Sequence, residues 1–190
     1  MRVEEFPIYG LYLFHPDVYN DSRGYFQETY NEGMYEKIGI TNRFVQDNQA
    51  LSIQPGVLRG LHFQLPPYTQ AKLVRVITGS ILDVAVDLRR DSPTYCKWQS
   101  VELSGENKAI FFVPRGFAHA YITLCESTIV HYKVDDYYSP DHESGIIWND
   151  SDLGIDWPLK NPILSQKDRA LQSFADFDSS FYLNNQAKTS

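Results

Sequence analysis

Short segments rich in β-branched and aromatic residues recur along the middle of this chain. Tyrosine occurs 13 times and phenylalanine 11 times among 190 residues, and few segments show the apolar periodicity of a long helix. Turn-forming residues separate these segments, as at Gly79-Ser80, which suits a hairpin. We expect strands at residues 72–78, 81–88, 99–103, 109–113, 120–124 and 128–134. Regular short strands of this kind predict an all-β sandwich or barrel.

Two short helices are expected beside the strands. Residues 32–38 are the clearer candidate, because Gly39 follows and can end a helix, and a second helix is expected near residues 166–172. We find no internal repeat and no low-complexity segment. Residues 1–181 are therefore expected to form one domain, followed by a polar tail at residues 182–190.

Charge and composition exclude several classes of protein. The net charge is −7 and the isoelectric point is about 5.1, so there is no diffuse basic surface for nucleic acid. The acidic N-terminus is unlike a signal peptide, and no apolar stretch approaches the roughly 18 residues that span a bilayer. Cys96 and Cys125 are too few for a disulfide framework and suit small buried residues. A cytoplasmic protein that binds neither nucleic acid nor membrane is expected.

The segment 56–75 carries basic side chains within strand-like apolar sequence. These are Arg59, His62, Lys72 and Arg75. Burying a cation is costly unless an anionic group lies opposite it. The pattern therefore predicts a cavity lined by cations and a candidate base, facing a negatively charged or enolate-forming ligand.

His62 has two interpretations. A lone histidine on a strand is more often a hydrogen-bonded core residue than a catalyst. Regular alternation places His62 and Gly60 on one face and Arg59 on the other, unless a bulge near Gly60 turns Arg59 into the same cavity. A histidine base also needs a carboxylate to set its tautomer. The residues alone leave that choice open among 24 acidic side chains.

A second motif has the spacing of a tight turn that enters a strand. Pro114, Gly116 and His119 follow the pattern Pro-x-Gly-x-x-His, which resembles the second motif of the cupin superfamily, a jelly-roll architecture. Metal-binding cupins have His-x-His in their first motif, whereas the stretch 62–64 here reads His-Phe-Gln. An amide is a poor ligand for zinc or iron, and a nearby lysine repels a cation, so no metal is expected.

Tyrosines near the end of the strand region are candidates for the same cavity. Most of the 13 tyrosines are best explained as packing residues. Tyr132 gains importance if it shares a face with His119. Tyr138 lies where a strand ends in a loop, and its ring suits stacking on a planar group such as a nucleobase.

Taken together, the motifs resemble those of the dTDP-4-dehydrorhamnose 3,5-epimerase family over residues 5–170. The matching stretches are residues 21–29, 44–48, 56–75, 83–89, 114–119, 132–133, 137–140, 147–150, 154–158 and 165–168, in this order. The resemblance implies an all-β cupin jelly roll and an isomerase of dTDP-L-rhamnose biosynthesis. It also implies proton exchange beside a ketone, with no metal and no cofactor.

The resemblance implies the reaction and its catalytic residues. C3 and C5 of dTDP-4-dehydro-6-deoxy-D-glucose would be epimerised through an enolate to give dTDP-4-dehydro-L-rhamnose. His62 would be the base, Tyr132 the acid, Asp168 the carboxylate that orients His62, and Lys72 the cation at the enolate oxygen.

The resemblance also implies how the nucleotide sugar is bound. The implied binding residues are Arg23, Glu28, Gln46, Asn48, Arg59, His119, Tyr138, Glu143 and Lys167. Among them, Arg59 would contact the diphosphate or sugar and Tyr138 would stack on thymine. A homodimer is implied, in which an N-terminal strand adds to the partner's sheet and brings Arg23 and Glu28 to the partner's site.

Two residues depart from the family pattern. Ala71 precedes Lys72 and Ala120 follows His119, where glycine is usual in the family. Each adds a methyl group beside a functional residue, which could narrow the pocket and so bears on which sugar is accepted and on whether both carbons are epimerised. Three other functions stay open: a mono-epimerase acting at C3 or C5 only, a non-catalytic cupin that binds a nucleotide or sugar, and a metal-dependent cupin oxygenase, which Gln64 disfavours.

Overall fold

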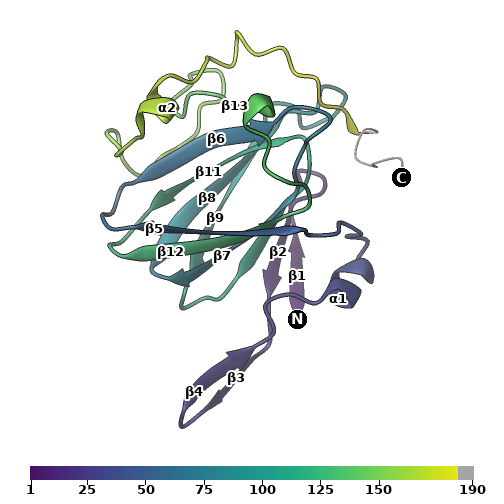
Figure 1. The fold of residues 1–190 in the computed structure, drawn as a ribbon, viewed down its shortest axis with the longest axis vertical. Helices are drawn as coiled ribbons and strands as arrows, with labels where there is room; N and C mark the ends of the chain where they lie inside the picture. Colours follow the sequence, from purple (N-terminus) through teal and green to yellow (C-terminus); the bar gives the residue numbers. More distant parts are fainter. Residues whose placement is uncertain (184–190) are drawn as a thin grey trace.

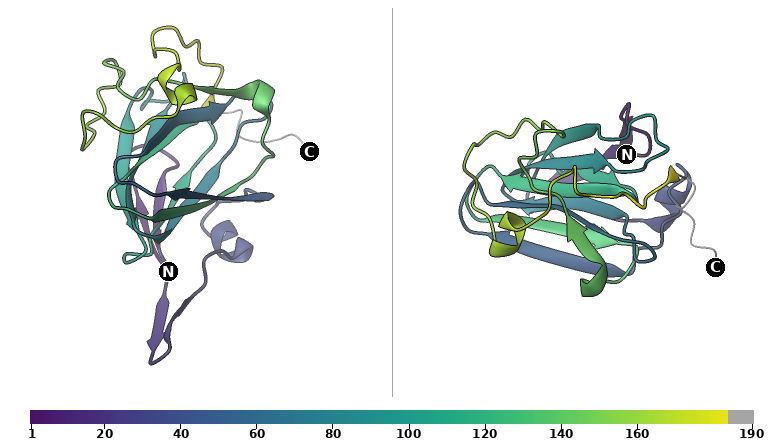
Figure 2. Two further views of the ribbon diagram at one scale, coloured as in Figure 1. Left: turned by 60° about the vertical axis from the view of Figure 1, so that its left-hand side comes forward. Right: turned by 90° about the horizontal axis from the view of Figure 1, so that it is seen from above.

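Two antiparallel sheets that face each other make up most of the molecule (Figure 1, Figure 2). The structure is a computed structural model and describes residues 1–183. The six-stranded sheet has the order β1 (Arg2–Glu5), β2 (Tyr12–His15), β10 (Ile110–Val113), β7 (Lys72–Thr78), β12 (Thr128–Val134) and β5 (Gln46–Ser52). The five-stranded sheet has the order β13 (Glu143–Gly145), β6 (Leu58–Gln64), β11 (Phe117–Thr123), β8 (Ser80–Asp87) and β9 (Trp98–Ser104). This double sheet is a jelly roll.

The predicted all-β class and the predicted strands are confirmed. Strand β7 has the expected bounds, and the turn before β8 contains Gly79 in the left-handed region, with φ of 83°. The expected strand 120–124 is the second half of β11, which already begins at Phe117. The pattern before residue 56 was too irregular to predict strands β1 to β5, four of which are only four residues long.

Helices are short and few among residues 1–183. Helix α1 (Glu32–Glu36) lies where it was expected, and Gly39 follows it with φ of 87°. Helix α2 (Gln166–Arg169) ends three residues before the predicted bound. A 3₁₀ helix covers Pro140–His142. No helix in this part of the chain is long and apolar enough to cross a membrane.

Each sheet has apolar residues on both faces. Residues from both sheets, including Val74, Phe111 and Phe117, form the core between them. The outer face of the five-stranded sheet is covered by the C-terminal segment through Phe177 and Phe181. Tyr35 of α1 packs on the outer face of the six-stranded sheet. Because successive strand residues point to opposite faces, these packing requirements decide which residues face the space between the sheets.

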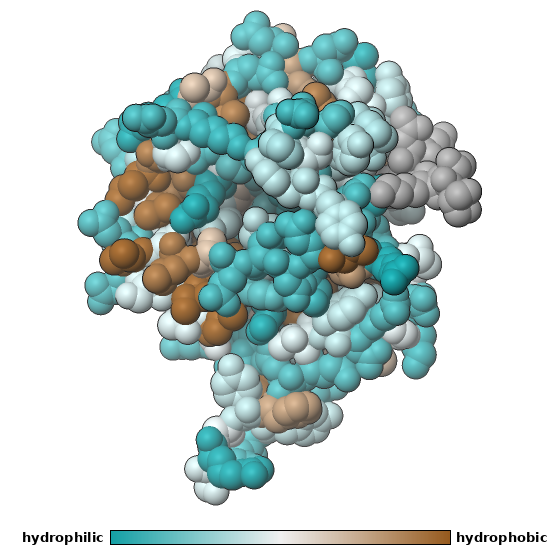
Figure 3. Space-filling model, viewed as in Figure 1, coloured by the Kyte–Doolittle hydropathy of each residue, from teal (hydrophilic) through white to brown (hydrophobic). Residues whose placement is uncertain are grey.

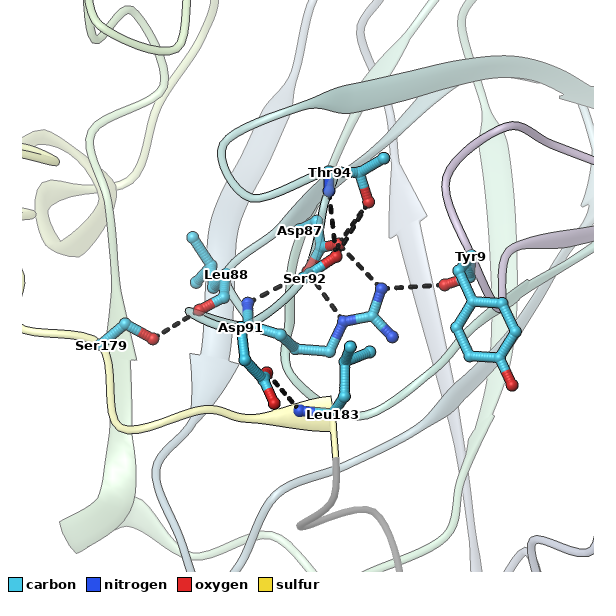
Figure 4. A network of polar contacts seen from close by, with 9 residues as sticks. Tyr9, Asp87, Leu88, Asp91, Ser92, Thr94, Ser179 and Leu183 are labelled. Atoms are coloured by element: carbon cyan, nitrogen blue, oxygen red, sulfur yellow. Dashed lines mark hydrogen bonds and ion pairs between the residues drawn. The ribbon is translucent and has the colours of Figure 1, made fainter.

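A polar network fastens the loop after β8 to both ends of the chain (Figure 4). The Asp87 carboxylate is fully buried and accepts hydrogen bonds from Arg89, Ser92 and Thr94. Arg89 also donates to the carbonyl of Tyr9. Ser179 donates to the carbonyl of Leu88, and the backbone of Leu183 donates to Asp91 (Figure 4). The predicted tail, apart from Tyr182 and Leu183, lies outside the described residues.

One hairpin stands away from the two sheets. Strands β3 (Val18–Asp21) and β4 (Gly24–Gln27) pair only with each other and project from the molecule at the bottom of Figure 1. Tyr19 and Phe26 are 65% and 68% exposed on this hairpin. The projection is also visible in the space-filling view (Figure 3). Exposed aromatic residues on a projecting hairpin are typical of a surface that contacts another chain.

Candidate active site

A cavity of about 210 Å³ opens between β6 of one sheet and β5, β7 and β12 of the other. It is lined by Gln46, Asn48, His62, Phe63, Gln64, Gln70, Lys72, Tyr132, Tyr138 and Glu143. Seven of these belong to the predicted site: Gln46, Asn48, His62, Lys72, Tyr132, Tyr138 and Glu143. Residues that are up to 97 positions apart in the chain, from Gln46 to Glu143, therefore meet in one cavity.

His62 is held by a carboxylate at the wall of the cavity. Its Nε2 lies 2.5 Å from Oδ1 of Asp168. Ser165, which caps α2, donates to Oδ2 of Asp168 at 2.8 Å and accepts from its backbone N–H at 3.0 Å. Burial alone would raise the pKa of Asp168, but the hydrogen bonds from His62 and Ser165 outweigh it and hold the pKa below its ordinary value.

The ionised Asp168 determines the state of the histidine. A carboxylate can only accept hydrogen bonds, so Nε2 of His62 carries the proton. In the neutral imidazole, Nδ1 is then the unprotonated nitrogen and is able to accept a proton. Sequence reasoning missed the contribution of Ser165, although Ser165 lies in the helix-capping position three residues before Asp168.

Tyr132 lies on β12, in the sheet opposite His62. Its neighbours in register are Val74 on β7 and Asn48 on β5. Burial raises the pKa of the Tyr132 phenol; the positive charge of Arg59 opposes this rise and the negative charge of Glu143 adds to it. The hydroxyl is therefore protonated near neutral pH and can act as a donor.

Lys72 is the first residue of β7 and lines the same cavity. Burial lowers the pKa of its ammonium group to about 8, while the negative charges of Asp83 and Glu143 oppose the decrease. Lys72 is thus mostly cationic at pH 7. A fixed cation beside a cavity stabilises negative charge that develops on an oxygen during a reaction.

A second histidine–aspartate pair lies behind the cavity. Nε2 of His119 lies 2.8 Å and 3.0 Å from the two carboxylate oxygens of Asp83, and both residues are buried. Burial lowers the pKa of His119; Lys72 and His62 lower it further, and Asp83 opposes the decrease. Asp83 lies within one of the matched motifs, but the sequence assigned it no role. Its position opposite His119 becomes visible only from the pairing of β8 with β11.

Of the two alternatives for Arg59, regular alternation and a bulge near Gly60, the structure shows the bulge. On β6, Arg59 and His62 are three residues apart, but they pair with Tyr121 and His119, which are two residues apart on β11. The extra residue turns Arg59 to the face of His62. Gly60 has φ of 125°, and a Cβ at this position would lie 2.4 Å from Cβ of Ala120, so glycine is required here. Arg59 does not line the cavity but lies beyond it, with Nη2 3.5 Å from the carbonyl of Leu51.

The mouth of the cavity is held by hydrogen bonds. Tyr138 donates to Glu143 at 2.5 Å, and Lys167 forms an ion pair with the same carboxylate. The backbone N–H of Tyr138 donates to Gln46 at 3.1 Å. Gln64 accepts from the backbone of Ser139 at 2.7 Å and donates to two carbonyls of the surrounding loops. The ring of Tyr138 is 53% exposed and is available for stacking.

Gln64 therefore uses its amide to shape the mouth of the cavity. Among residues 1–183, no group of three or more His, Cys, Asp or Glu side chains is arranged to hold a metal ion.

Two predicted binding residues lie away from the cavity of their own chain. Arg23 is at the tip of the projecting hairpin, where it pairs with Asp21. Glu28 follows β4 and accepts a hydrogen bond from Asn31. Neither residue lines the cavity.

The expected narrowing of the pocket is wrong. Ala120 packs in the apolar cluster on the outer face of the five-stranded sheet, and Ala71 packs in the cluster below α1. Both point away from the space between the sheets, because Ala71 is next in sequence to Lys72 and Ala120 to His119, and successive strand residues point to opposite faces. Arg75, three residues after Lys72, is for the same reason not part of the lining and pairs in register with His131.

The fold and site define the class of protein. A jelly roll in which a histidine–aspartate pair faces a protonated tyrosine and a lysine is a cupin-type enzyme able to move protons without changing the oxidation state of its substrate. The chain belongs to the dTDP-4-dehydrorhamnose 3,5-epimerase family, whose model matches residues 5–176. It is therefore an isomerase.

Individual relatives agree with this membership. The dTDP-4-dehydrorhamnose 3,5-epimerase of Methanothermobacter thermautotrophicus is 53% identical over 84% of this chain and 87% of its own length. The crystal structure of the Bacillus anthracis enzyme with TDP and PPi bound is 49% identical, with a TM-score of 0.89 over 90% of this chain and 98% of that chain. The Legionella pneumophila enzyme, in complex with dTDP-4-keto-L-rhamnose, is 46% identical, with a TM-score of 0.89 over 93% and 94% of the two chains.

Proposed function

We propose that this enzyme converts dTDP-4-dehydro-6-deoxy-D-glucose to dTDP-4-dehydro-L-rhamnose by inverting C3 and C5, in dTDP-L-rhamnose biosynthesis. The main support is that His62, with its Asp168 partner, and Tyr132 lie on opposite sheets and line the same cavity. Inversion requires a base on one face of the sugar ring and an acid on the other. This arrangement suits that requirement.

The reaction follows from the chemistry of a ketone. The 4-keto group acidifies the hydrogens on both flanking carbons, and Nδ1 of His62 removes each proton in turn. The electron pair moves to the ketone oxygen, where Lys72 stabilises the enolate. Tyr132 then gives its proton to the opposite face of the carbon, and no cofactor or metal is required. A positioned base or acid typically contributes a factor on the order of 10²–10⁴ to the rate.

Residues around the cavity are proposed to bind the nucleotide sugar. Tyr138 stacks on thymine, supported by its exposed ring at the mouth of the cavity. Arg59 contacts the diphosphate or sugar, since the bulge turns it to the face of His62. Gln46, Asn48, His119, Glu143 and Lys167 complete the binding set.

We further propose a homodimer in which the β3–β4 hairpin brings Arg23 and Glu28 to the partner's cavity. The support is that both residues lie away from the cavity of their own chain, on or directly after a projecting hairpin with exposed aromatic residues. Mixing inactive Arg23→Ala and His62→Ala proteins under subunit exchange tests this. In each mixed dimer, one site would combine the native His62 of the Arg23→Ala chain with the native Arg23 of the His62→Ala chain, so activity should return. No recovery despite exchange would contradict the proposal.

Solvent deuterium tests the reaction directly. Incubation with dTDP-4-dehydro-6-deoxy-D-glucose in deuterated water should place deuterium at both C3 and C5 of the product. Label at one carbon would identify a mono-epimerase, and label at neither would leave a protein that only binds the sugar nucleotide. A His62→Ala control should give no label yet still bind dTDP.

The remaining proposals concern context. We infer that residues 1–181 act as a single cupin domain, since the C-terminal segment packs on the five-stranded sheet. We also infer a cytoplasmic location, because nucleotide sugars of this kind are intermediates of biosynthesis.

A further inference from the structure

Tyr121 is a buried tyrosine whose hydroxyl has no hydrogen-bond partner among the described residues. It is 4% exposed and lies on β11, two residues after His119 and therefore on the same face. Its ring packs in the core between the sheets. A buried polar group without a partner is costly, and a phenylalanine would fill the same space without that cost. The hydroxyl therefore calls for an explanation beyond packing.

The surroundings of Tyr121 belong to the active site. In register, Tyr121 lies between Arg59 on β6 and Asp83 on β8. The ring centroid of His119 is 6.4 Å away. From the opposite sheet, Tyr132 packs against the same core cluster. Tyr132 lines the cavity and Tyr121 does not, but Tyr121 belongs to the core cluster against which the proposed acid packs.

We propose that Tyr121 is a positioning residue for the acid: its hydroxyl donates a hydrogen bond to the Tyr132 oxygen once Tyr132 has given its proton to the substrate carbon. This inference rests on the proposed function. In that step the O–H bond of Tyr132 breaks, the new C–H bond forms, and the electron pair of the broken bond stays on the Tyr132 oxygen. Tyr121 keeps its own proton. After each inversion the phenolate regains a proton from solvent and His62 releases its proton to solvent, so both groups are ready for the second carbon.

The neighbouring charges are consistent with this role. The charges that act on Tyr132 are the cation of Arg59, which favours a phenolate, and the anion of Glu143, which disfavours it. The anion of Asp83 acts on Tyr121 and favours its protonated form. Burial raises the pKa of Tyr121 to about 12, with Arg59 opposing and Tyr132 and Asp83 adding to the rise. Tyr121 therefore keeps its proton while Tyr132 is ionised. A neutral donor beside a buried anion stabilises the anion.

The variant Tyr121→Phe isolates this hydroxyl. The ring and its packing remain, and the lost group is unpaired in the free enzyme. Thermal stability should therefore be equal to or higher than that of the native enzyme, and dTDP affinity should be unchanged. We expect kcat for inversion to fall about tenfold, with KM changed less than twofold, because a hydrogen bond to a charged group is lost only after proton transfer.

A sharper measurement is the ratio in which the enolate is protonated on its original face, by His62, or on the opposite face, by Tyr132. In deuterated water, proton removal by His62 is unaffected, and the protonated imidazole exchanges its proton for deuterium from solvent. Delivery by Tyr132 is slowed, so His62 more often returns deuterium to the original face. Recovered substrate from Tyr121→Phe should therefore contain several times more deuterium per turnover than substrate from the native enzyme. Tyr35→Phe, which alters another buried tyrosine on the outer side of the six-stranded sheet, is the matched control and should leave the ratio unchanged.

Two outcomes separate this inference from the function on which it rests. If the native enzyme incorporates no deuterium, the proposed function fails. If the native enzyme turns over and Tyr121→Phe has the native kcat and the native ratio of exchange to inversion, only the role of Tyr121 is overturned. An equal loss of exchange and inversion would also overturn it, because the defect would then precede proton delivery.

Discussion

His62 and His119 are register partners on paired strands, and each has its Nε2 bonded to an aspartate, yet the two pairs differ in access to the cavity. The His62 side chain is 26% exposed and lines the cavity, whereas the His119 side chain is 7% exposed and lies behind it. The same pair of residue types thus serves two purposes. The more exposed His62 is suited to proton transfer, whereas the buried His119 is held rigidly by Asp83 and is suited to binding and to supporting the wall of the site.

Replacement of His62 should have the largest effect. His62→Ala is expected to lower kcat by a factor on the order of 10²–10⁴, because the base is lost while the cavity and its binding groups remain. Affinity for dTDP, measured by calorimetry, should change by less than about threefold. Loss of dTDP binding would mean that His62 supports the site and is not only its base.

The pH dependence should depend on Lys72. The pKa of this lysine is lowered to about 8, so its cation is lost as the pH rises through 8, and kcat/KM should then fall about tenfold per pH unit. Asp83 opposes the decrease in this pKa, so Asp83→Asn should move the decline to lower pH.

Lys72→Arg is the control for this pH dependence. A guanidinium stays charged at alkaline pH, so the decline near pH 8 should disappear, whatever the activity that remains. An unchanged decline in Lys72→Arg would assign it to another group.

Replacement of His119 should lower stability more and kcat less than replacement of His62 does. His119→Ala leaves the buried Asp83 without its donor, which costs about 1–3 kcal/mol of stability. Urea denaturation should show this loss, and kcat should fall less than in His62→Ala. A larger kcat loss than in His62→Ala, at native stability, would break the comparison between the two pairs.

Replacement of Tyr138 should have the smallest effect, and this effect should be on dTDP affinity. Tyr138→Ala removes the exposed ring at the mouth of the cavity, and loss of stacking worth about 1 kcal/mol should weaken dTDP binding roughly fivefold. Tyr138→Phe keeps the ring and loses only the hydrogen bond to Glu143, so it should bind dTDP nearly as the native enzyme does. Equal weakening in both variants would indicate that the hydroxyl, not the ring, matters.

Local patterns predicted much of the sheet structure. Strand β7 and its turn at Gly79 follow from β-branched residues bounded by a glycine, and α1 follows from its glycine stop. Strands β1 to β5 were not predicted. β10 is as short as β1, β3 and β4, but its four residues are apolar and buried, whereas those three strands are mostly exposed and lack an apolar pattern. The bulge at Gly60 stayed an alternative to regular alternation, because the sequence does not determine the register between β6 and β11.

The sequence by itself determined the family, the all-β class and the candidate residues of the reaction, since these depend on residue types in a fixed order along the chain. Only the tertiary structure decided which of those residues meet. It placed Asp83 against His119, put Ala120 on the face away from the cavity, left Arg23 outside the cavity of its own chain, and brought Tyr121 into the core cluster against which Tyr132 packs. The reason is physical: alternation along one strand is a local property, whereas register between strands and contact across two sheets arise from packing of the whole core.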